Sequence, residues 1–336
     1  MKVPFVHGPN DLRIEEIAPP EAGPRDAVIR VATVGICGSD LNYVALGGLA
    51  GPTDRPMPLG HELAGTITQL GAEVAGFSIG ERVLLNPTFN FVGNGGTEGG
   101  FATELLIRDL AGSPESLLPM PAAMDFDTGA LIEPLAVARH GVKRLGAKPG
   151  DKVAVFGAGP IGLGAVVSLR QLGIEDVVVF DLSAFRRERA LALGARAAFD
   201  PRENPPEPAL TELHGTDLLY GTIPKPGTTH YLEASGAPVL PEIVEYARFG
   251  AIIAVVSIQK KPVTLNLQTM LAKEMTLITS MAYPNELPEV MQMLRESKID
   301  LAPMVSHHFP GDDFMDAFAM AKQQDQAAKV LVHYSH

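Results

Sequence analysis

One short segment constrains the fold of this chain more than any other. The run VAVFGAGPIG places Gly157, Gly159 and Gly162 in the spacing G-x-G-x-x-G, directly after a strand-like run and directly before a helix-like one. In this context the first glycine permits a tight turn, the second lets a pyrophosphate approach the backbone, and the third lets helix and strand pack closely. The helix would begin at Pro160 and Ile161, and the unpaired N–H groups of its first turn, which proline itself lacks, attract phosphates. The segment therefore predicts a dinucleotide-binding βαβ unit.

An acidic residue ends the next strand-like run, DVVVFD. This residue, Asp181, lies about 20 positions after the last glycine, where a carboxylate accepts hydrogen bonds from the adenosine ribose. Its charge would repel the 2′-phosphate of NADP by about 4 kcal/mol at roughly 4 Å and an effective dielectric constant of about 20. The next residue, Leu182, offers that phosphate no positive charge, and Arg186 is expected near the adenine or ribose. NAD is thus the predicted cofactor; the alternative is an ordinary turn with a surface aspartate.

Two regions of the chain have different sequence patterns. Over residues 12–108, short β-branched runs alternate with Gly- and Pro-rich turns, which is typical of antiparallel β structure. From about residue 150, apolar strands alternate with amphipathic helical runs, and about six candidate strands match a doubly wound parallel sheet. With 336 residues, 46% of them hydrophobic, the chain can form about two domains with sizeable cores.

Composition excludes several classes of protein. A formal net charge of −12 gives no generic attraction to nucleic acid or anionic lipid. The single cysteine excludes an intrachain disulfide framework and any zinc cluster made only of cysteines. The first residues carry acidic groups and no continuous apolar run, so no signal peptide is expected. A cytoplasmic protein without nucleic-acid or membrane partners is predicted.

A second group of motifs carries residue types that bind metals. Cys37 occurs in GICGSD, His61 and Glu62 in GHE, and Glu133 in LIEP. A thiolate, an imidazole and carboxylates suit zinc, and three protein ligands plus an exchangeable water characterise a catalytic zinc. Such an ion would bind an alcohol oxygen and favour the alkoxide. From spacing alone, the alternative is a buried free cysteine, a core histidine and two solvated carboxylates.

Together these motifs resemble the zinc-containing medium-chain dehydrogenase/reductase family, specifically its polyol (sorbitol-type) dehydrogenase branch. The resemblance covers nearly the whole chain, because GICGSD, PLGHE, ALIEPLAVA, VAVFGAGPIG, LEASGAP and SHHFP follow the family's order. It implies an α/β protein with a GroES-like antiparallel β catalytic domain at 1–135, a doubly wound Rossmann NAD-binding domain at 136–278, and a C-terminal return to the catalytic domain at 279–336. It also implies a homodimer or homotetramer, with the strand near MTLITS extending a sheet across subunits.

The resemblance also implies roles for individual residues. Cys37 and His61 correspond to zinc ligands, and Glu62 corresponds to the third ligand of the polyol branch. Glu133 corresponds to a residue that either binds the ion or holds its water. Ser39 corresponds to the hydroxyl that relays the alcohol proton. The residues expected beside the substrate are Tyr43 and Tyr283, and those expected to line the nicotinamide are Val256, Ser257, Ile258, Ser280 and Met281.

Three departures from the family pattern stand out. The segment 86–100 contains no cysteine, so the structural zinc lobe is missing and one catalytic zinc per chain is implied. Asn42 stands where the family often has a histidine that passes the proton to solvent, and an amide cannot titrate. Ala282 stands where sorbitol-type enzymes carry an arginine that grips a substrate hydroxyl. Together with Met281, Phe89 and Phe91, this change favours a substrate less polar than a free hexitol.

The predicted function is a zinc-dependent oxidoreductase that transfers a hydride between a secondary alcohol or polyol and NAD. Two alternatives stay open: a metal-independent NADPH quinone or enone reductase of the same fold, and a non-catalytic dinucleotide-binding protein. Retention of the Cys-His-Glu set together with Ser39 counts against both, and Asp181 counts against NADPH.

Overall fold

A computed structural model describes residues 1–259, 261–297 and 299–334, which form two compact units. The first unit comprises Met1–Glu133, Val305–Gln323 and Lys329–His336, and the second comprises Pro134–Met304 and Gln324–Ala328. The sequence placed the boundaries at 135/136 and 278/279. The chain therefore returns to the first unit later than predicted. Residues before Val305 stay with the second unit because Glu286 pairs there with His140, at 3.1 Å, and with Lys143, at 3.0 Å.

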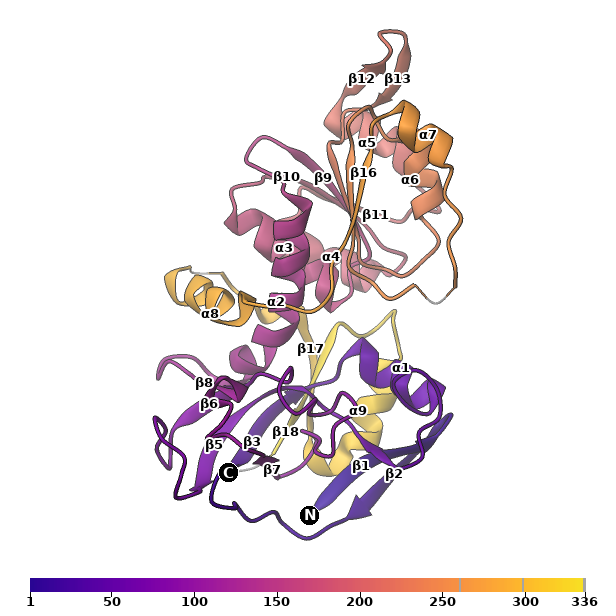
Figure 1. Ribbon diagram of the computed structural model, residues 1–336. Helices are drawn as coiled ribbons and strands as arrows, with labels where there is room; N and C mark the ends of the chain where they lie inside the picture. The colour runs from indigo at the N-terminus through magenta and orange to yellow at the C-terminus, as the bar shows by residue number, and fades with distance from the viewer. Residues whose placement is uncertain (260, 298, 335–336) are drawn as a thin grey trace. The chain divides into compact units, whose positions relative to one another are not determined.

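The first unit is built on a seven-stranded sheet in the order β17-β18-β3-β5-β6-β8, with β7 also paired to β3 (Figure 1). Its strands are β3 (Ala27–Gly35), β5 (Glu62–Leu70), β6 (Arg82–Leu85), β7 (Glu104–Ile107), β8 (Leu117–Pro119), β17 (Val305–Pro310) and β18 (Lys329–His333). A smaller sheet joins β1 (Lys2–Gly8), β2 (Asp11–Glu16) and β4 (Met57–Pro58), and the helices are α1 (Gly38–Leu46) and α9 (Phe314–Ala321). All neighbours in the large sheet are antiparallel except β17 and β18.

The central strand of this sheet, β3, explains why the first unit folds as it does. Its sequence AVIRVATVG is rich in β-branched residues, and every position except Arg30 is buried. Such a strand needs neighbours on both edges and cover on both faces. The strand pairs with β5, β7 and β18, so segments from the start, middle and end of the chain meet at its edges.

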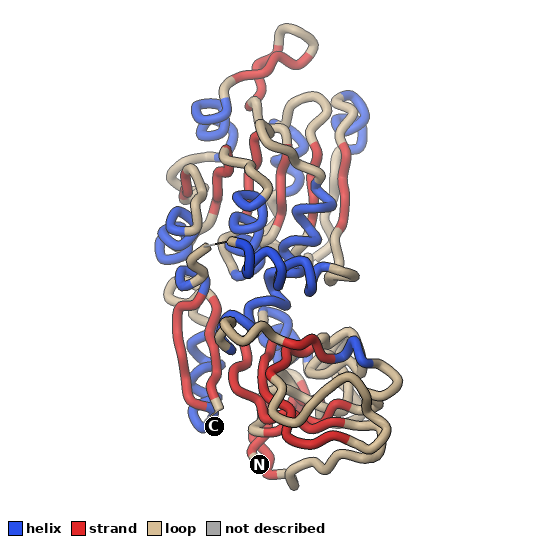
Figure 2. The backbone as a smooth tube through the Cα atoms, turned by 90° about the vertical axis from the view of Figure 1, so that its left-hand side faces the viewer, coloured by secondary structure: helices blue, strands red, loops and turns tan. Residues whose placement is uncertain are grey.

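The second unit contains a six-stranded sheet in the order β11-β10-β9-β14-β15-β16, with all neighbours parallel. The strands are β9 (Lys152–Phe156), β10 (Asp176–Phe180), β11 (Ala197–Phe199), β14 (His230–Glu233), β15 (Ile252–Val255) and β16 (Thr276–Thr279). Helices cover both faces of the sheet (Figures 1 and 2). They are α3 (Pro160–Gln171), α4 (Ala184–Ala192), α5 (Pro206–His214), α6 (Leu240–Tyr246) and α7 (Leu267–Ala272). A further helix, α8 (Glu286–Glu296), is ion-paired to α2 (Phe126–Leu145), which begins in the first unit. The strands β12 (Thr216–Leu219) and β13 (Ile223–Pro226) form a hairpin.

The strand order places the topological switch point between β9 and β14. In doubly wound sheets, dinucleotides bind at the carboxyl ends of the strands where the order reverses. Here those ends are followed by Gly157 and by Ala234, respectively. The predicted fold class, an antiparallel β unit combined with a doubly wound parallel unit, is confirmed. No helix in the described part of the chain is long and apolar enough to cross a membrane.

Candidate active site and dinucleotide site

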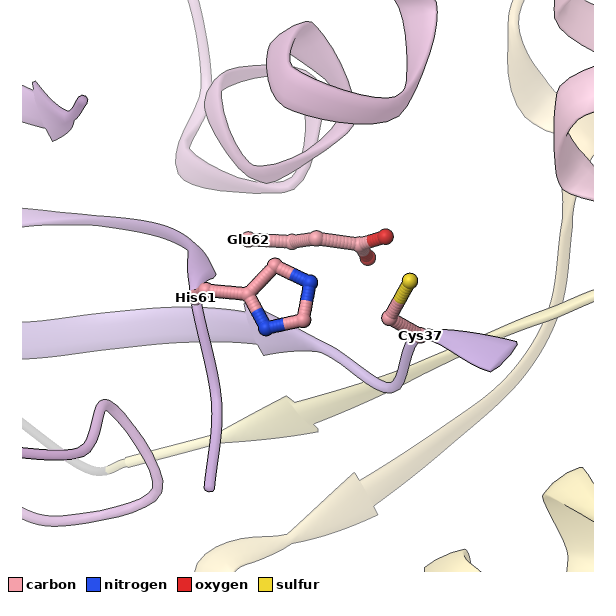
Figure 3. A group of neighbouring side chains, drawn as sticks. All are labelled: Cys37, His61 and Glu62. Carbon is pink, nitrogen blue, oxygen red and sulfur yellow. The ribbon is translucent and has the colours of Figure 1, made fainter. Parts of the chain in front are cut away.

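Three metal-binding side chains converge in the first unit. Cys37 precedes α1, and His61 and Glu62 lie at the start of β5. One ligand atom from each residue lies within 4.8 Å of the other two, and the thiol, imidazole and carboxylate face one another (Figure 3). Strand pairing explains the convergence, because Gly35 at the end of β3 is opposite Glu62. The chain passes from Gly35 to Cys37 in two residues, so the thiol emerges beside the β5 carboxylate.

This cluster fits a zinc ion. The Oε1 atom of Glu62 is buried and has no hydrogen-bond partner among the described residues. Buried carboxylate oxygens are rarely left unpaired, so such an atom indicates a ligand. The donor set of sulfur, nitrogen and oxygen is one that zinc accepts, and a coordinated thiol is held as the thiolate. Cys37, His61 and Glu62 would hold the ion.

A buried aspartate, which sequence reasoning did not assign, orients the cluster from behind. Asp40 accepts hydrogen bonds from the backbone N–H of Cys37, at 2.8 Å, and of Gly60, at 3.3 Å. Its Oδ1 lies 3.7 Å from Nδ1 of His61. At that distance Nδ1 makes no hydrogen bond to the carboxylate, so Asp40 acts on the imidazole through its charge, which raises the pKa of His61. The signal was present in the sequence, since Asp40 belongs to the GICGSD motif.

A buried lysine holds the other side of the cluster. The Nζ of Lys329, on β18, donates to Glu62 and, at 3.1 Å, to the carbonyl oxygen of Ile36. The pair occupies one carboxylate oxygen and leaves Oε1 of Glu62 available. Glu62 and Lys329 are 267 residues apart in the chain. No local pattern could have predicted this contact.

The pKa values show how strongly these groups interact. Burial raises the pKa of the Cys37 thiol, and the nearby charge of Glu62 raises it further. Burial opposes protonation of His61, but the carboxylate of Asp40 and the thiolate of Cys37 outweigh it and raise the pKa of the imidazole. Burial likewise disfavours the Lys329 ammonium, but Glu62 keeps the lysine pKa above its ordinary value. The positive charge of a metal ion would favour the thiolate that burial disfavours.

Two hydroxyl groups predicted to act at the site lie beside the cluster. The Oγ of Ser39 is 3.3 Å from Nε2 of His61. The Tyr43 hydroxyl donates to Oδ1 of Asn94 at 3.1 Å, and burial raises the pKa of Tyr43 to about 12. Glu133 is buried, and its negative charge raises the pKa values of both His61 and Tyr43. Glu133 is not a member of the three-residue cluster.

The glycine-rich turn of the second unit has the geometry that its spacing predicted. Gly157 adopts φ 97°, in the left-handed region, and a Cβ there would lie 2.9 Å from Ser235. A Cβ on Gly162 would collide with the Gly157 carbonyl oxygen. Gly159 precedes the first residue of α3, Pro160, and a Cβ there would meet only the Arg186 guanidinium, at 3.8 Å. The first and third glycines are therefore required by packing, whereas the second leaves open space in front of the helix N-terminus.

Asp181 follows β10 and lies beside this turn. Its Oδ2 accepts the N–H of Ala158 at 2.6 Å, and its Oδ1 accepts the N–H of Ser183 at 2.8 Å. Each carboxylate oxygen keeps further acceptor capacity for a ribose hydroxyl. Arg186 donates from Nε to the carbonyl oxygen of Ala327 at 2.8 Å, and burial lowers its pKa.

The residues expected to line the nicotinamide follow β15 and β16. Ser257 donates to the buried carboxylate of Glu233, and the Ser280 N–H donates to the carbonyl oxygen of Val255 at 2.9 Å. Val256 donates its N–H to the Glu233 carbonyl oxygen at 2.9 Å. Exposure differs among the others: Ile258 is 65% exposed, Met281 is 84% exposed, and Tyr283, expected beside the substrate, is 5% exposed.

Glu233 is a second buried carboxylate that sequence reasoning missed. It ends β14 at the switch point and accepts hydrogen bonds from Ser235, Gly236 and Gln259, at 2.6–2.8 Å, as well as from Ser257. These bonds fix the two loops that follow β14 and β15. The motif LEASGAP, in which it lies, was the available signal.

Comparison with known proteins agrees with this architecture. Residues 23–122 match the alcohol dehydrogenase GroES-like domain, and residues 160–296 match the zinc-binding dehydrogenase domain. The chain is 31% identical over 339 residues to sorbitol dehydrogenase of Bos taurus, which covers 95% of this chain and 92% of that one. The crystal structure of 2R,3R-butanediol dehydrogenase from Bacillus subtilis shares 28% identity and a TM-score of 0.85, covering 99% of both chains. A short chain alcohol dehydrogenase of Escherichia coli CFT073 complexed with NADH shares 26% identity, with the same TM-score and coverage.

The two units, one with the metal-ligand cluster and one with the dinucleotide fold, define an oxidoreductase of the alcohol dehydrogenase class. Within that class, the chain belongs to the zinc-containing medium-chain dehydrogenase/reductase family, in its polyol dehydrogenase branch. The family predicted from the motifs is confirmed.

Proposed function

We propose that this enzyme interconverts a secondary alcohol or polyol and the corresponding ketone, with NAD as the hydride carrier and one catalytic zinc ion per chain. The observation that carries the proposal is the convergence of Cys37, His61 and Glu62 around an unpartnered buried carboxylate oxygen. A buried free cysteine with a core histidine, the simpler alternative, would leave that oxygen unexplained. The presence of this donor set also disfavours the metal-independent reductases of the same fold.

The chain's own side chains would handle the alcohol proton. Zinc held by the cluster would supply a Lewis acid that lowers the pKa of the substrate hydroxyl. Ser39, 3.3 Å from His61, would take that proton. Tyr43, which its pKa of about 12 keeps protonated, already donates to Asn94, so it would accept a hydrogen bond from a substrate hydroxyl. Asn42 cannot titrate, so this side chain would not carry the proton onward.

The geometry favours Glu62 over Glu133 as the third ligand. Glu62 belongs to the converging group, whereas Glu133 lies outside it and acts on the cluster through its charge. Lys329 neutralises part of the charge that a cysteine thiolate and a glutamate bring to the ion. In this assignment Glu133 would hold the exchangeable water.

Cofactor choice would depend on Asp181. Its two oxygens are fixed beside the turn by the N–H groups of Ala158 and Ser183. A carboxylate held in this way presents a negative charge where NADP would place its 2′-phosphate, and that charge favours NAD.

A panel of alcohols, assayed by NADH absorbance together with metal analysis of the purified protein, tests the proposal. Relatives of this chain act on sorbitol and on a vicinal butanediol. The Ala282 position, which lacks the expected arginine, favours the diol over the hexitol. We expect zinc-dependent oxidation of short secondary alcohols or diols with higher kcat/KM than sorbitol. Turnover by the metal-free enzyme would contradict the zinc mechanism.

We also propose a homodimer, or a homotetramer built from it, that pairs β16 of two chains. This strand is one edge of the six-stranded sheet, and in α7, the helix that precedes it in the chain, Leu267 and Leu271 are 73% and 79% exposed. Unpaired edge strands with apolar neighbours are sites of chain association. Sedimentation analysis would show a monomer if this assignment were wrong. A cytoplasmic location is part of the proposal, because a reducing compartment preserves the Cys37 thiolate that zinc needs.

A further inference from the structure

Three further metal-binding side chains gather in the first unit, outside the Cys37 cluster. Asp127 lies in the first turn of α2, His308 on β17 and His333 on β18. One ligand atom from each lies within 4.8 Å of the other two. The Nδ1 of His308 is 2.9 Å from Nε2 of His333 and 3.6 Å from Oδ2 of Asp127. The Nδ1 of His333 is 3.5 Å from Oδ1 of Asp127.

The register of the sheet, rather than chance contact at the surface, brings these groups together. His308 pairs with Leu331 in the parallel β17–β18 ladder. Because alternate residues of a strand share a face, His333 lies on the same face as His308, one step along. Thr33 on β3 pairs directly with His333, and its hydroxyl donates to Oδ1 of Asp127 at 2.9 Å. Three adjacent strands and the start of a helix therefore position the three ligands.

The donor set and the distances suit a transition metal. Two imidazoles and a carboxylate bind Zn²⁺, Cu²⁺ and Ni²⁺ well. Zinc–ligand bonds of about 2.0–2.2 Å at tetrahedral angles place neighbouring ligand atoms about 3.3–3.5 Å apart. The distances to Asp127, 3.6 Å from His308 Nδ1 and 3.5 Å from His333 Nδ1, lie close to that range. The 2.9 Å contact between His308 Nδ1 and His333 Nε2 is a hydrogen bond that a bound ion would replace. We propose that Asp127, His308 and His333 form a second, non-catalytic site for a divalent transition metal ion such as Zn²⁺.

The site is open to solvent and shares no ligand with the Cys37 cluster. His308 is exposed, so water can complete the coordination sphere. His333 lies four residues beyond Lys329 on β18, which is about 13 Å along a strand. A bound ion would connect the first turn of α2 to both C-terminal strands. Because it binds only the folded chain, it would stabilise the protein by an amount that grows with the logarithm of its free concentration above the Kd.

Metal titration of the untagged, zinc-loaded enzyme tests this site. We expect calorimetry to show uptake of a second equivalent of Zn²⁺, accompanied by a rise in Tm. In His308→Ala and in Asp127→Asn, the affinity for that second equivalent should fall at least about tenfold, since even outer-shell changes cost about 10- to 100-fold. The rise in Tm at the same zinc concentration should disappear with it.

Two variants separate the proposed site from other sources of metal binding. His307→Ala removes the neighbouring imidazole, which lies on the opposite face of β17 and contacts Ser306 Oγ at 3.0 Å, and this variant should bind as the wild type does. Cys37→Ser should also keep this uptake even if the catalytic zinc is lost. Uptake unchanged by His308→Ala, or abolished equally by His307→Ala, would overturn the proposal.

Cu²⁺ provides a spectroscopic readout that does not depend on activity. Added to the zinc-loaded enzyme, it should show nitrogen hyperfine coupling from two imidazoles and no thiolate charge-transfer band. A thiolate band would place the copper at Cys37 and would overturn the assignment.

Discussion

The candidate site of the first unit consists of side chains, whereas that of the second unit consists mainly of backbone groups. In the first unit, ionisable side chains from three separate stretches of chain gather; they are the half-buried Cys37 and the buried Asp40, His61, Glu62 and Lys329. In the second unit, the proposed phosphate-binding site is a continuous stretch of backbone, 157–162, accompanied by one carboxylate at Asp181. Backbone N–H groups are available wherever a turn is fixed, so a local sequence can specify them. A metal cluster needs side chains that only tertiary pairing can assemble.

A buried ion pair of the first unit and a buried histidine of the second unit respond differently to their surroundings. In the first unit, the Lys329 ammonium faces the Glu62 carboxylate. In the second unit, His214 is buried as a neutral ring: burial lowers its pKa to about 4, although Asp176 opposes the change. Removing one partner of a buried charge pair leaves an uncompensated charge, which costs about 3–5 kcal/mol. Glu62 therefore depends on its partner, whereas His214 is accommodated without a charge.

The largest expected effect is a loss of turnover that leaves NADH binding nearly unchanged. Cys37→Ser and His61→Ala should each lower turnover by at least about 1000-fold, because several kcal/mol of Lewis-acid stabilisation are lost. Both should reduce bound zinc, while NADH affinity stays within about twofold of wild type, since the dinucleotide site lies in the other unit. Kinetics, elemental analysis and NADH fluorescence titration measure the three quantities. His7→Ala, which removes an imidazole paired with Glu15 outside the cluster, serves as the control. Full activity in either Cys37→Ser or His61→Ala would contradict the proposal that these side chains hold a catalytic metal ion in the first unit.

The second prediction concerns the pH dependence of stability that the neutral, buried His214 introduces. The folded-state pKa of His214 is about 4 and its ordinary value is 6.5, so the unfolded chain binds the proton more readily between those pH values. The contribution of His214 to stability is complete above pH 6.5 and is lost as the pH falls toward 4, by at most about 3 kcal/mol. His214→Asn can keep the hydrogen bond to Thr228 and should flatten this part of the stability–pH profile. Denaturant unfolding at several pH values from 7 to 4 measures the free energy of unfolding. If that free energy falls equally steeply with pH in the wild type and in His214→Asn, His214 is not the group responsible.

The third prediction distinguishes packing from ligand contact in the glycine-rich turn. Gly159→Ala has room for its methyl group in the folded chain, so Tm should stay near that of the wild type. Its methyl group would meet the pyrophosphate, and NADH affinity should fall by about 100-fold, or about 2.7 kcal/mol. Gly162→Ala forces a collision with the Gly157 carbonyl oxygen and should lower both Tm and NADH affinity. Unchanged NADH binding in Gly159→Ala would mean that the pyrophosphate lies elsewhere.

The smallest expected effect is on cofactor choice. Asp181→Ser removes hydrogen bonds to a charged acceptor, worth about 1.5–3 kcal/mol, and removes the charge that repels a 2′-phosphate. The NAD/NADP preference should therefore fall by about one to two orders of magnitude. Kinetics with both cofactors at fixed ionic strength measure the ratio. A wild-type enzyme that already prefers NADP would show that Asp181 does not hold the ribose.

Much of the second unit could be predicted from local sequence. Gly157, Gly159 and Gly162 lie within one strand–turn–helix, and Asp181 ends the next strand, so spacing alone specified their geometry. The return of the chain to the first unit at Val305 was not predictable in this way. It depends on where α8 packs, and that is decided by the contacts of Glu286 with α2.

The candidate metal site was only partly accessible to sequence reasoning. The sequence by itself determined the residue types and their order: Cys37, His61 and Glu62 occur in recognisable motifs. Only the tertiary structure decided that Lys329 occupies one oxygen of Glu62, and that Asp127, His308 and His333 meet beside Thr33. The physical reason is that local spacing fixes backbone geometry over a turn or two, whereas burial and strand register act between residues hundreds of positions apart.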